Sequence, residues 1–476
     1  MCFFRWATTC LRRLAIAPVT EEFDFVIIGA GSAGCAAAYQ LAKAGVGSIA
    51  VLEAGLTNRV PQVKVPFGLA WTRGSKRDWR FLTTPQEALN GRQIAVTRGK
   101  MIGGSSSINS MVWFPGRRDD YDNWDVDGWR WDDVATDFEA IEEIVEPRQF
   151  ATPHPLSRDY ALLLGDNGNA PPTPERESAG VFLCNLHDGA RRSAADAFLN
   201  PARETGQVSM ITSCNVDRLI FEEGRARQVL LIDGRRITAR GGILLSAGSI
   251  GSPSILMRSG IGPADHLKSL DIEPLVDAPQ VGQNLHDHPA VGVHYQGPNS
   301  GYGLALNQMP HWASAPFNWL LRRKGRWASQ IVEAGSFFRA APVGEDGDDR
   351  PDCQSHFIPF MVGYKGSFIT WGSGYSADVN VCRPVSRGQL RLASSDPSVH
   401  PDVDLALLKD RRDMATIKHG VMRLRALMEK APLGDHRVVV SVQVEVAGEL
   451  LGRRLSGVAP VCVSLSLAEE LDRHLC

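Results

Sequence analysis

The chain has 476 residues, of which 43% are hydrophobic and 22% charged, so its composition is that of a soluble globular protein long enough for two or three domains. A formal net charge of −2, without a basic stripe that carries aromatic residues, argues against a nucleic-acid partner. No apolar run approaches the roughly 20 residues that cross a bilayer, so no transmembrane segment is predicted.

The first 22 residues differ from those that follow, because they contain Arg5, Arg12 and Arg13 and no acidic residue before Glu21. Both a targeting segment and a disordered start have this basic character, and the short length without an apolar core or cleavage site favours the disordered start. The nine cysteines show no CxxC pair and no metal-ligand spacing. We therefore expect reduced thiols, no metal site and a cytoplasmic location, with peripheral membrane contact left open.

Residues 25–55 predict a βαβ unit. An apolar strand at 25–28 runs into the GxGxxG turn Gly29-Ala30-Gly31-Ser32-Ala33-Gly34, and a small-residue helix follows as far as Gly45. A second apolar run leads into Glu53, 19 residues after the turn. In such a unit the glycines and the helix N-terminus receive a pyrophosphate, and the carboxylate accepts hydrogen bonds from ribose hydroxyls. The motif predicts a dinucleotide site but does not separate NAD from FAD.

The second informative stretch is residues 98–116, RGKMIGGSSSINSMVWFPG. Its glycines and serines supply backbone N–H groups and hydroxyls without bulky side chains, which suits a loop that passes close to a flat or phosphorylated ligand. A Gly/Ser linker is the alternative, although a linker does not usually run into an apolar segment. The Pro- and Gly-rich residues 56–97 predict loops and short strands, residues 147–180 predict loops, and residues 117–145 predict helix.

Residues 193–262 predict a helix, a β-meander and a second strand-to-helix crossover. Ser193 can cap an amphipathic helix that Pro201 limits. Strands are expected at 210–212, 216–221 and 228–232, with a turn at Glu223-Gly224. Residues 242–262 then indicate a buried strand, small residues and a helix with Pro253 near its first turn.

From about residue 290 to 435, short apolar runs alternate with Gly and Pro around many aromatics, which predicts an α+β domain with an antiparallel sheet. Its clearest helix is 411–430, because the apolar residues Met414, Ile417, Val421, Leu424 and Leu427 share one face. The expected domains are a nucleotide-binding domain at 23–289, with insertions at about 56–97 and 117–205, and a substrate domain at 290–435.

The glycine-bearing stretches together resemble the glucose–methanol–choline (GMC) family of flavin oxidoreductases, and most of all its bacterial choline-dehydrogenase-like branch. The resemblance covers about residues 23–435. It rests on GAGSAG with LEAG, RGKMIGGSSSIN, AGSIGSPSILMRSGIG and VGQNLHDHP, at residues 29–34 with 52–55, 98–109, 247–262 and 281–289. It implies an α/β FAD-binding domain, Rossmann-like and of the glutathione-reductase type, with FAD as the cofactor, and a second α+β substrate domain on an antiparallel sheet.

The resemblance also assigns FAD-binding residues by position. The GxGxxG turn meets the pyrophosphate, Glu53 the adenosine ribose, and the 98–112 loop the flavin, while Val216 is similar to the family's adenine-contacting valine. The expected cofactor-binding residues are Gly29, Gly31, Ser32, Ala33, Gly34, Glu53, Arg98, Met101, Gly103, Gly104, Ser106, Asn109, Val112 and Val216.

The chemistry that the resemblance implies is oxidation of a small-molecule alcohol to an aldehyde or ketone. A histidine base removes the hydroxyl proton while hydride moves from carbon to flavin N5. In the family this base lies in a segment similar to HPVGTCRMG, and its partner in one similar to SGNTNAP. Neither segment occurs in this sequence, and residues 436–476 form an atypical tail. The electron acceptor, which could be oxygen, a quinone or another molecule, and the oligomeric state stay open.

We therefore expect a C-terminus that is truncated or read out of frame, impaired activity, and catalytic residues that cannot be named. His286 and His288 belong to the family's NLxDH turn and are expected to be satisfied loop histidines, and His474 lies almost at the C-terminus. An alternative function is an FAD-binding remnant without turnover. A third hypothesis is an NAD-dependent dehydrogenase, which Glu53 permits but the Gly-Gly-Ser-Ser-Ser loop and residues 247–262 do not fit.

Overall fold

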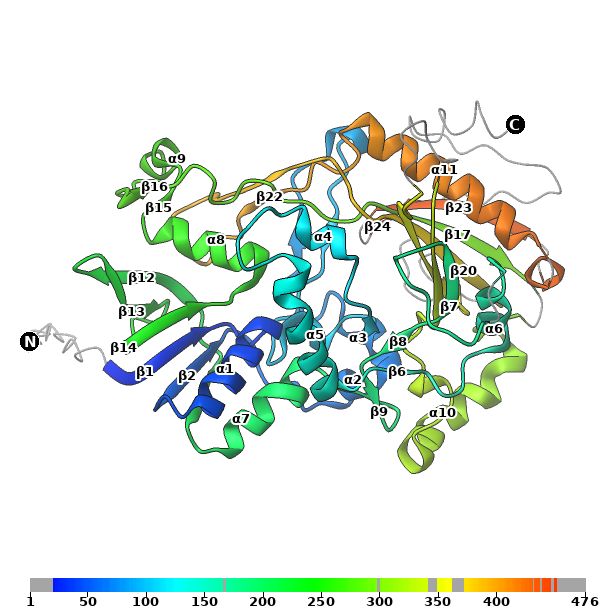
Figure 1. Cartoon of the computed structure of the whole chain (residues 1–476), viewed down its shortest axis with the longest axis horizontal. Helices are drawn as coiled ribbons and strands as arrows, with labels where there is room; N and C mark the ends of the chain where they lie inside the picture. Colours follow the sequence, from blue (N-terminus) through cyan, green and yellow to red (C-terminus); the bar gives the residue numbers. More distant parts are fainter. Residues whose placement is uncertain are drawn as a thin grey trace, which may run out of the picture.

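The computed structural model of the chain describes residues 20–165, 168–297, 300–340, 349–361, 372–430, 432–436, 439–446 and 449–451. Two large β-sheets dominate it, one toward each end of the long axis of the molecule (Figure 1). The expectations for residues 1–19 and 452–476 lie outside the described residues. Within the described ranges, no helix combines the length and the apolar character needed to cross a bilayer.

The first sheet has six strands in the order β11-β2-β1-β14-β13-β12. Its strands are β1 (Thr20–Ile28), β2 (Ile49–Glu53), β11 (Val208–Thr212), β12 (Val216–Glu222), β13 (Arg225–Leu231) and β14 (Arg236–Leu245). Strand β1 pairs in parallel with β2 and β14, and β2 pairs in parallel with β11. Strands β12, β13 and β14 form an antiparallel meander, which confirms the predicted hairpin of 216–221 and 228–232. The predicted strand at 210–212 belongs to β11 and lies outside the meander, because β11 pairs in parallel with β2. Glu223 and Gly224 form the first turn of the meander with φ of 50° and 75°, the left-handed backbone that tight hairpins favour.

Helices cover both faces of this sheet. Helix α1 (Ser32–Ala44) packs on the face that carries Ile27 and ends at Gly45, as predicted. Helix α8 (Gly248–Arg258) contributes Ile255 to the opposite face, beside Ile28. Because neighbouring residues of a strand point to opposite faces, the apolar run of β1 supplies both cores.

Two prolines correct the expected helix boundaries. The helix after Ser193 starts as a π-helical turn at Ala195–Leu199 and continues as α7 (Asn200–Glu204), with Pro201 in the first turn of α7. Pro201 therefore does not end the helix, because the first turn of a helix needs no N–H from that residue. Pro253 lies inside α8 and not near its first turn, because α8 already begins at Gly248.

The second sheet has seven strands in the order β24-β23-β17-β20-β19-β18-β7, and every pairing in it is antiparallel. Its strands are β7 (Ser178–Val181), β17 (Ala290–Gln296), β18 (Ala334–Phe338), β19 (Cys353–Ile358), β20 (Gly374–Val381), β23 (Val439–Val446) and β24 (Glu449–Leu451). Helix α11 (Arg411–Met428) crosses the sheet and buries Ile417, Val421 and Leu424, which confirms the predicted helix and the predicted antiparallel sheet.

The second sheet recruits strands from outside residues 290–435. Strand β7 comes from the expected insertion 117–205 and pairs with β18. Strand β23 pairs with β17 from Gly292↔Gln443 to Gln296↔Val439. The expectation that the chain after residue 436 is an atypical tail is thus wrong for residues 439–446 and 449–451, which form β23 and β24. The alternating Val-Val-Ser-Val-Gln-Val-Glu-Val at 439–446 has the period of a strand.

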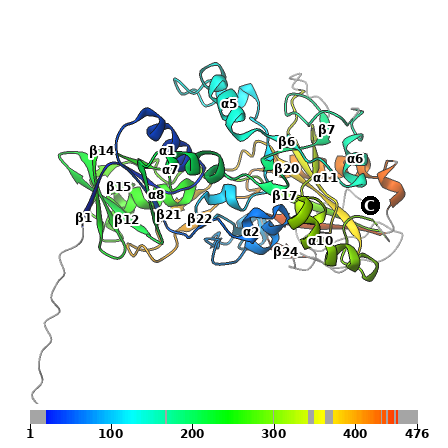
Figure 2. The ribbon, with the colours of Figure 1, turned by 90° about the horizontal axis from the view of Figure 1, so that it is seen from below.

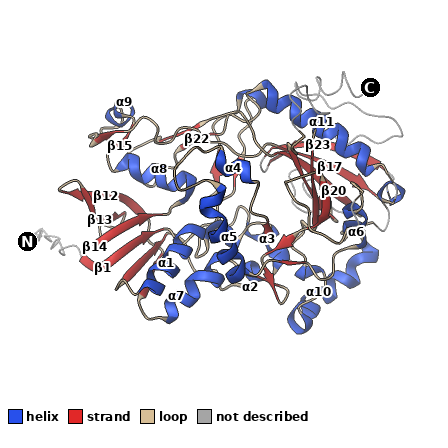
Figure 3. Ribbon diagram, in the orientation of Figure 1, coloured by secondary structure: helices blue, strands red, loops and turns tan. Residues whose placement is uncertain are grey.

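Shorter elements connect the two sheets (Figure 3). The remaining helices are α2 (Pro61–Lys64), α3 (Leu69–Thr72), α4 (Arg118–Asp122), α5 (Trp131–Val145), α6 (Pro155–Ala161), α9 (Ala264–Lys268) and α10 (Met309–Arg322). The hairpin of β21 (Gln389–Arg391) and β22 (Asp402–Asp404) reaches from the second sheet back toward α8 (Figure 1).

Candidate functional site

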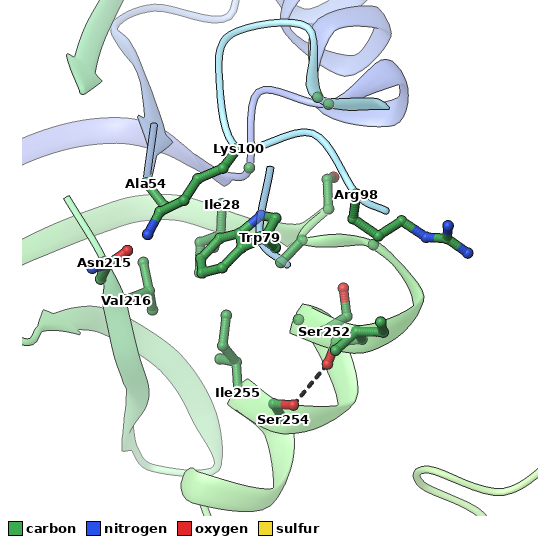
Figure 4. Close-up of a pocket in the computed structure, with 18 of the residues that line it drawn as sticks. Ile28, Ala54, Trp79, Arg98, Lys100, Asn215, Val216, Ser252, Ser254 and Ile255 are labelled. Carbon is green, nitrogen blue, oxygen red and sulfur yellow. Dashed lines mark hydrogen bonds between the residues drawn. The ribbon is translucent and has the colours of Figure 1, made fainter. Parts of the chain in front are cut away.

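A cavity of about 780 Å³ opens at the carboxyl ends of β1, β2 and β14. Ligands of open α/β sheets bind at this edge. The walls of the cavity come from the GxGxxG turn, the end of β2, residues 98–105, residues 214–216, the start of α8 and residues 397–401 (Figure 4). Segments that are far apart in the sequence therefore enclose one space.

The GxGxxG turn and the 98–109 loop touch each other beside this cavity. The N–H of Gly103 donates a hydrogen bond of 2.7 Å to the carbonyl oxygen of Ala30. Gly104 lies so close to the turn that a Cβ on it would be 2.7 Å from the Cα of Gly31. Arg98 forms an ion pair of 3.2 Å with Asp287, which belongs to the VGQNLHDHP motif. The structure thus brings three of the sequence motifs to one place.

The glycines of the turn differ in what surrounds them. Gly29 has a φ of +96°, and a Cβ on it would lie 2.6 Å from the carbonyl oxygen of Ser246. A Cβ on Gly34 would lie only 1.9 Å from the carbonyl oxygen of Gly29, so α1 packs directly on the turn. A Cβ on Gly31 would meet no atom within 4 Å. Gly31 therefore presents bare backbone to the cavity at the N-terminus of α1, where an anion is favoured.

Glu53 is buried in the cavity wall, and two backbone N–H groups hold its carboxylate. Ala30 donates to Oε2 at 3.0 Å and Gly55 donates to Oε1 at 2.8 Å. Burial raises the pKa of this carboxyl to about 7, and the two N–H bonds oppose that rise. Each oxygen keeps a further lone pair, so the carboxylate can still accept a hydrogen bond from a ligand hydroxyl.

The structure divides the expected cofactor residues into two groups. Those that line the cavity are Gly29, Gly31, Ser32, Ala33, Glu53, Arg98, Gly104 and Val216. Those that do not line it are Gly34, Met101, Gly103, Ser106, Asn109 and Val112. Members of the second group support the walls: Met101 is buried against Val63 and Ile108, and the hydroxyl of Ser106 donates to the Gly103 carbonyl.

Arg191 is a residue that the sequence analysis missed. Its side chain is buried, its Nε donates to the Val63 carbonyl, and its guanidinium donates to the Ser106 carbonyl and to Oδ1 of Asn109 at 2.8 Å. Burial lowers the pKa of Arg191 to about 9. Arg191 therefore fixes the 98–109 loop from behind, and no local sequence pattern marks that long-range role.

Four further residues of the cavity wall were also missed: Trp79, Lys100, Asn215 and His400. The amino group of Lys100 lies 4.4 Å from the Trp79 ring centre, and Trp79 stacks on Phe81. The His400 ring lies 4.8 Å from Phe81, and burial together with nearby cations lowers its pKa. Oδ1 of Asn215 is buried without a hydrogen-bond partner among the described residues, so it is an acceptor or dipole that a ligand can use.

The two loop histidines lie outside the cavity lining. Burial lowers the pKa of both the His286 and the His288 side chains. The backbone N–H of His288 donates a hydrogen bond of 2.9 Å to Oδ1 of Asp287. Among the described residues that line the cavity, His400 is the only histidine.

A second buried carboxylate lies in the substrate lobe, which comprises residues 290–435 together with strands β7, β23 and β24. Glu333 is fully buried and accepts four hydrogen bonds, from the His154 N–H and from the hydroxyls of Ser157, Tyr302 and Ser329. Burial raises its pKa. Aromatic rings lie next to it, and the guanidinium of Arg326 lies 5.5 Å from the ring centre of Tyr302.

The chain matches known protein families along most of its length. A GMC oxidoreductase model for the N-terminal part matches residues 23–290, and a GMC oxidoreductase model for the C-terminal part matches residues 384–454. The chain belongs to the GMC oxidoreductase family. The second of the two matches extends to residue 454, so the expected end of the resemblance at about residue 435 is wrong.

This GMC oxidoreductase has relatives among bacterial dehydrogenases. It is 34% identical over 443 residues to an oxygen-dependent choline dehydrogenase of Rhizobium etli, across 87% of this chain and 79% of the relative. It is 30% identical to an alcohol dehydrogenase [acceptor] of Pseudomonas putida, with the same coverage of both chains. The choline-dehydrogenase-like branch suggested by the motifs is thereby confirmed.

Solved structures confirm the fold of the GMC oxidoreductase. A pyridoxine 4-oxidase from Mesorbium loti superimposes with a TM-score of 0.75 at 25% identity, over 87% of this chain and 82% of that one. A formate oxidase superimposes with a TM-score of 0.74 at 24% identity, over 89% of this chain and 84% of that one, and shows the shared fold.

FAD is the cofactor of this family, and the described cavity fits it. The bare backbone of Gly31 at the helix N-terminus suits the pyrophosphate, and the carboxylate of Glu53 suits the ribose. The unpartnered Oδ1 of Asn215 lies beside Val216, the residue expected at the adenine. These features match a dinucleotide stretched along the edge of the first sheet.

The raised pKa of Glu53 predicts that FAD binding depends on pH. Ribose hydroxyls that donate to the carboxylate favour its ionised form, so bound FAD lowers a pKa that is about 7 in the free protein. We expect the Kd for FAD to be about tenfold higher at pH 6 than at pH 8. Fluorescence titration of the apoprotein measures both values.

The control for this prediction is Glu53→Gln, which removes the titrating group and should flatten the pH dependence. The same shift has a consequence for the apoprotein. Since the folded pKa lies above the ordinary value of 4.5, the stability that this shift contributes is complete below pH 4.5 and is lost as the pH rises through 7. An equal Kd at pH 6 and pH 8 in the unmodified protein would contradict the ribose role of Glu53.

Proposed function

We propose that this chain oxidises the CH–OH group of a small-molecule alcohol to an aldehyde or ketone, with FAD held in the described cavity. The observation that carries the proposal is the contact between the GxGxxG turn and the 98–109 loop around that cavity. FAD, when bound, supplies the hydride acceptor, flavin N5. Residues 23–289 would bind the cofactor, and residues 290–435, together with β7, β23 and β24, would bind the alcohol.

The residues of the chain would divide the work as follows. The backbone at Gly31 and the N-terminus of α1 would hold the pyrophosphate, and Glu53 would orient the ribose. Arg191, through its bond to Asn109, would keep the flavin-side loop in place. A loop fixed in this way supports a reaction whose rate depends on the distance and angle between reacting atoms.

The substrate that we propose to test first is choline, because the relatives named above include a choline dehydrogenase. Recognition of a quaternary ammonium calls for a carboxylate and aromatic rings. In the substrate lobe the carboxylate of Glu333 is fully buried and already accepts a hydrogen bond from Tyr302, and the guanidinium of Arg326 lies 5.0 Å from the Trp312 ring centre, so these residues do not offer a free site for a second cation. A neutral primary alcohol is therefore the necessary comparison substrate.

We also propose that turnover of the chain as printed is slow. The support is that the sequence contains no segment similar to HPVGTCRMG, in which the family places its histidine base. Loss of a general base typically lowers the rate by about 10²–10⁴. The C-terminal family match at residues 384–454 includes strands β23 and β24 of the second sheet.

Anaerobic mixing of the FAD-loaded protein with choline and with a panel of primary alcohols tests the function. We expect the oxidised flavin absorption to bleach slowly with at least one alcohol, and one aldehyde to form per flavin reduced. Adding a chemical reductant to a second sample shows that the bound flavin can be reduced. If the reductant bleaches the flavin while no alcohol does so, the alternative holds, and the chain is an FAD-binding remnant without turnover.

A further inference from the structure

Helix α10 exposes an apolar stripe along its outer face. The exposed fractions of Leu306, just before the helix, and of Phe317, Leu320 and Leu321 are 80%, 66%, 61% and 81%. Spacings of three and four residues place Phe317, Leu320 and Leu321 on one side of α10, and Leu306 lies in the 3-10 turn that leads into the helix. A surface helix normally turns polar residues outward, so this stripe calls for a partner.

The opposite face of α10 is firmly anchored in the protein. Ala315 and Trp319 are buried, and the indole N–H of Trp319 donates to the Gly189 carbonyl at 2.7 Å. Trp319 belongs to the same buried cluster as Phe67 and Phe360. The exposed stripe is therefore not the face by which α10 packs on the core, because Ala315 and Trp319 already form that face.

Basic residues border the stripe and acidic residues are absent from this part of the sequence. Residues 288–332 contain no Asp or Glu, and α10 is followed by Arg323 and Lys324. Arg323 lies 4.1 Å from the ring centre of Trp319, and Arg322 and Lys324 form no ion pair with any described residue. An apolar stripe with free cations at its end fits a surface that is both apolar and anionic.

The same character continues onto the neighbouring segment. Residues 54–77 also contain no Asp or Glu, and they carry five Lys or Arg residues. Trp71 in this segment is 42% exposed, and its ring lies 5.5 Å from that of Trp327, which follows α10. Figures 1 and 2 show α2 and α10 on the same side of the molecule.

We propose that this side of the molecule binds peripherally to the surface of an anionic lipid bilayer, with α10 lying in the interface. Phe317, Leu320 and Leu321 would enter the boundary between headgroups and acyl chains, while Arg322 and Lys324 contact anionic headgroups. A second copy of the chain fits less well. Two-fold symmetry would bring the same acid-free, basic patch against itself.

Co-sedimentation of the FAD-loaded full chain with lipid vesicles tests this proposal. We expect the protein to sediment with vesicles of phosphatidylcholine that contain phosphatidylglycerol, and much less with phosphatidylcholine alone. Raising the salt from about 0.05 M to 0.5 M should weaken the binding, because the cations are then screened. The double variant F317S/L321S should lower the partition coefficient by about tenfold or more, and R322E/K324E should abolish the preference for phosphatidylglycerol.

The matched control is L275S/V276S, which removes two apolar side chains that are 60% and 53% exposed at the opposite end of the molecule. Retained flavin absorbance and an unchanged melting temperature show that each variant is folded. The proposal is overturned if the unmodified protein does not sediment with the phosphatidylglycerol vesicles, or if the control loses as much binding as F317S/L321S. It is also overturned if F317S/L321S dissociates an oligomer of a protein that ignores vesicles, because the stripe is then a contact between copies.

Discussion

Gly31→Val will weaken the binding of FAD by at least about 100-fold, which corresponds to about 2.8 kcal/mol. The reason is that a Cβ added at this position meets no protein atom within 4 Å, so the new side chain extends into the cavity that Gly31 lines. There it would occupy the place where the backbone approaches the pyrophosphate. Isothermal titration of the apoprotein with FAD measures the loss.

The same substitution should leave the apoprotein almost as stable as before, within about 1 kcal/mol. Gly31 has a φ of −75°, which valine adopts without strain. A suitable control is Ala36→Val, which adds the same β-branched side chain to α1 at a position outside the cavity lining. Comparable FAD affinity in Gly31→Val and Ala36→Val would show that the pyrophosphate does not pass this turn.

Glu333→Ala will lower the free energy of unfolding by at least about 3 kcal/mol. The carboxylate is fully buried and accepts four hydrogen bonds, so its removal leaves one backbone N–H and three hydroxyls in a low-dielectric interior without their acceptor. Each unsatisfied buried donor costs about 1–3 kcal/mol, and rotation of the hydroxyls relieves part of this cost. Urea denaturation followed by tryptophan fluorescence measures the change.

Two comparison variants show whether that loss of stability comes from the hydrogen bonds of Glu333. Glu333→Gln keeps one acceptor oxygen at the same place and should lose clearly less stability than Glu333→Ala. Glu139→Ala removes an exposed carboxylate from α5 and should change the free energy of unfolding by no more than about 0.5 kcal/mol. A loss for Glu333→Ala as small as that for Glu139→Ala would mean that its hydrogen-bond network does not hold the substrate lobe together.

Local sequence patterns predicted the elements whose residues are close together in the chain. The βαβ unit, the hairpin of β12 and β13 and helix α11 follow from periodicity and from turn residues such as Glu223 and Gly224. The contact between the GxGxxG turn and the 98–109 loop was also expected, but on the basis of the family resemblance. Small residues at both places permit that contact without forcing it.

What the sequence did not reveal depends on pairing between distant segments. Strand β7 joins β18 from more than 150 residues away, and β23 joins β17 at a similar separation. The alternation of side chains along one strand does not predict which other strand it pairs with. For the same reason His400 in the cavity wall and Arg191 behind Asn109 could not be placed, because other parts of the fold bring them there.

The segment after residue 436 is the opposite case, because its local pattern does indicate a strand. The Val-rich segment after residue 436 has the period of a strand, whereas the absence of a catalytic motif there predicts an atypical tail. The family match and the pairing with β17 both place its first part in the substrate sheet. A missing catalytic motif and a missing structural element are therefore separate questions.

The absorption spectrum of the purified chain, recorded before and after addition of FAD and removal of the unbound excess, tests the central claim most directly. We predict the two visible bands of an oxidised flavin, with one FAD retained per chain and the retention lost in Gly31→Val. A colourless protein that retains no FAD, and that binds NAD instead, would contradict the placement of FAD between the GxGxxG turn and the 98–109 loop.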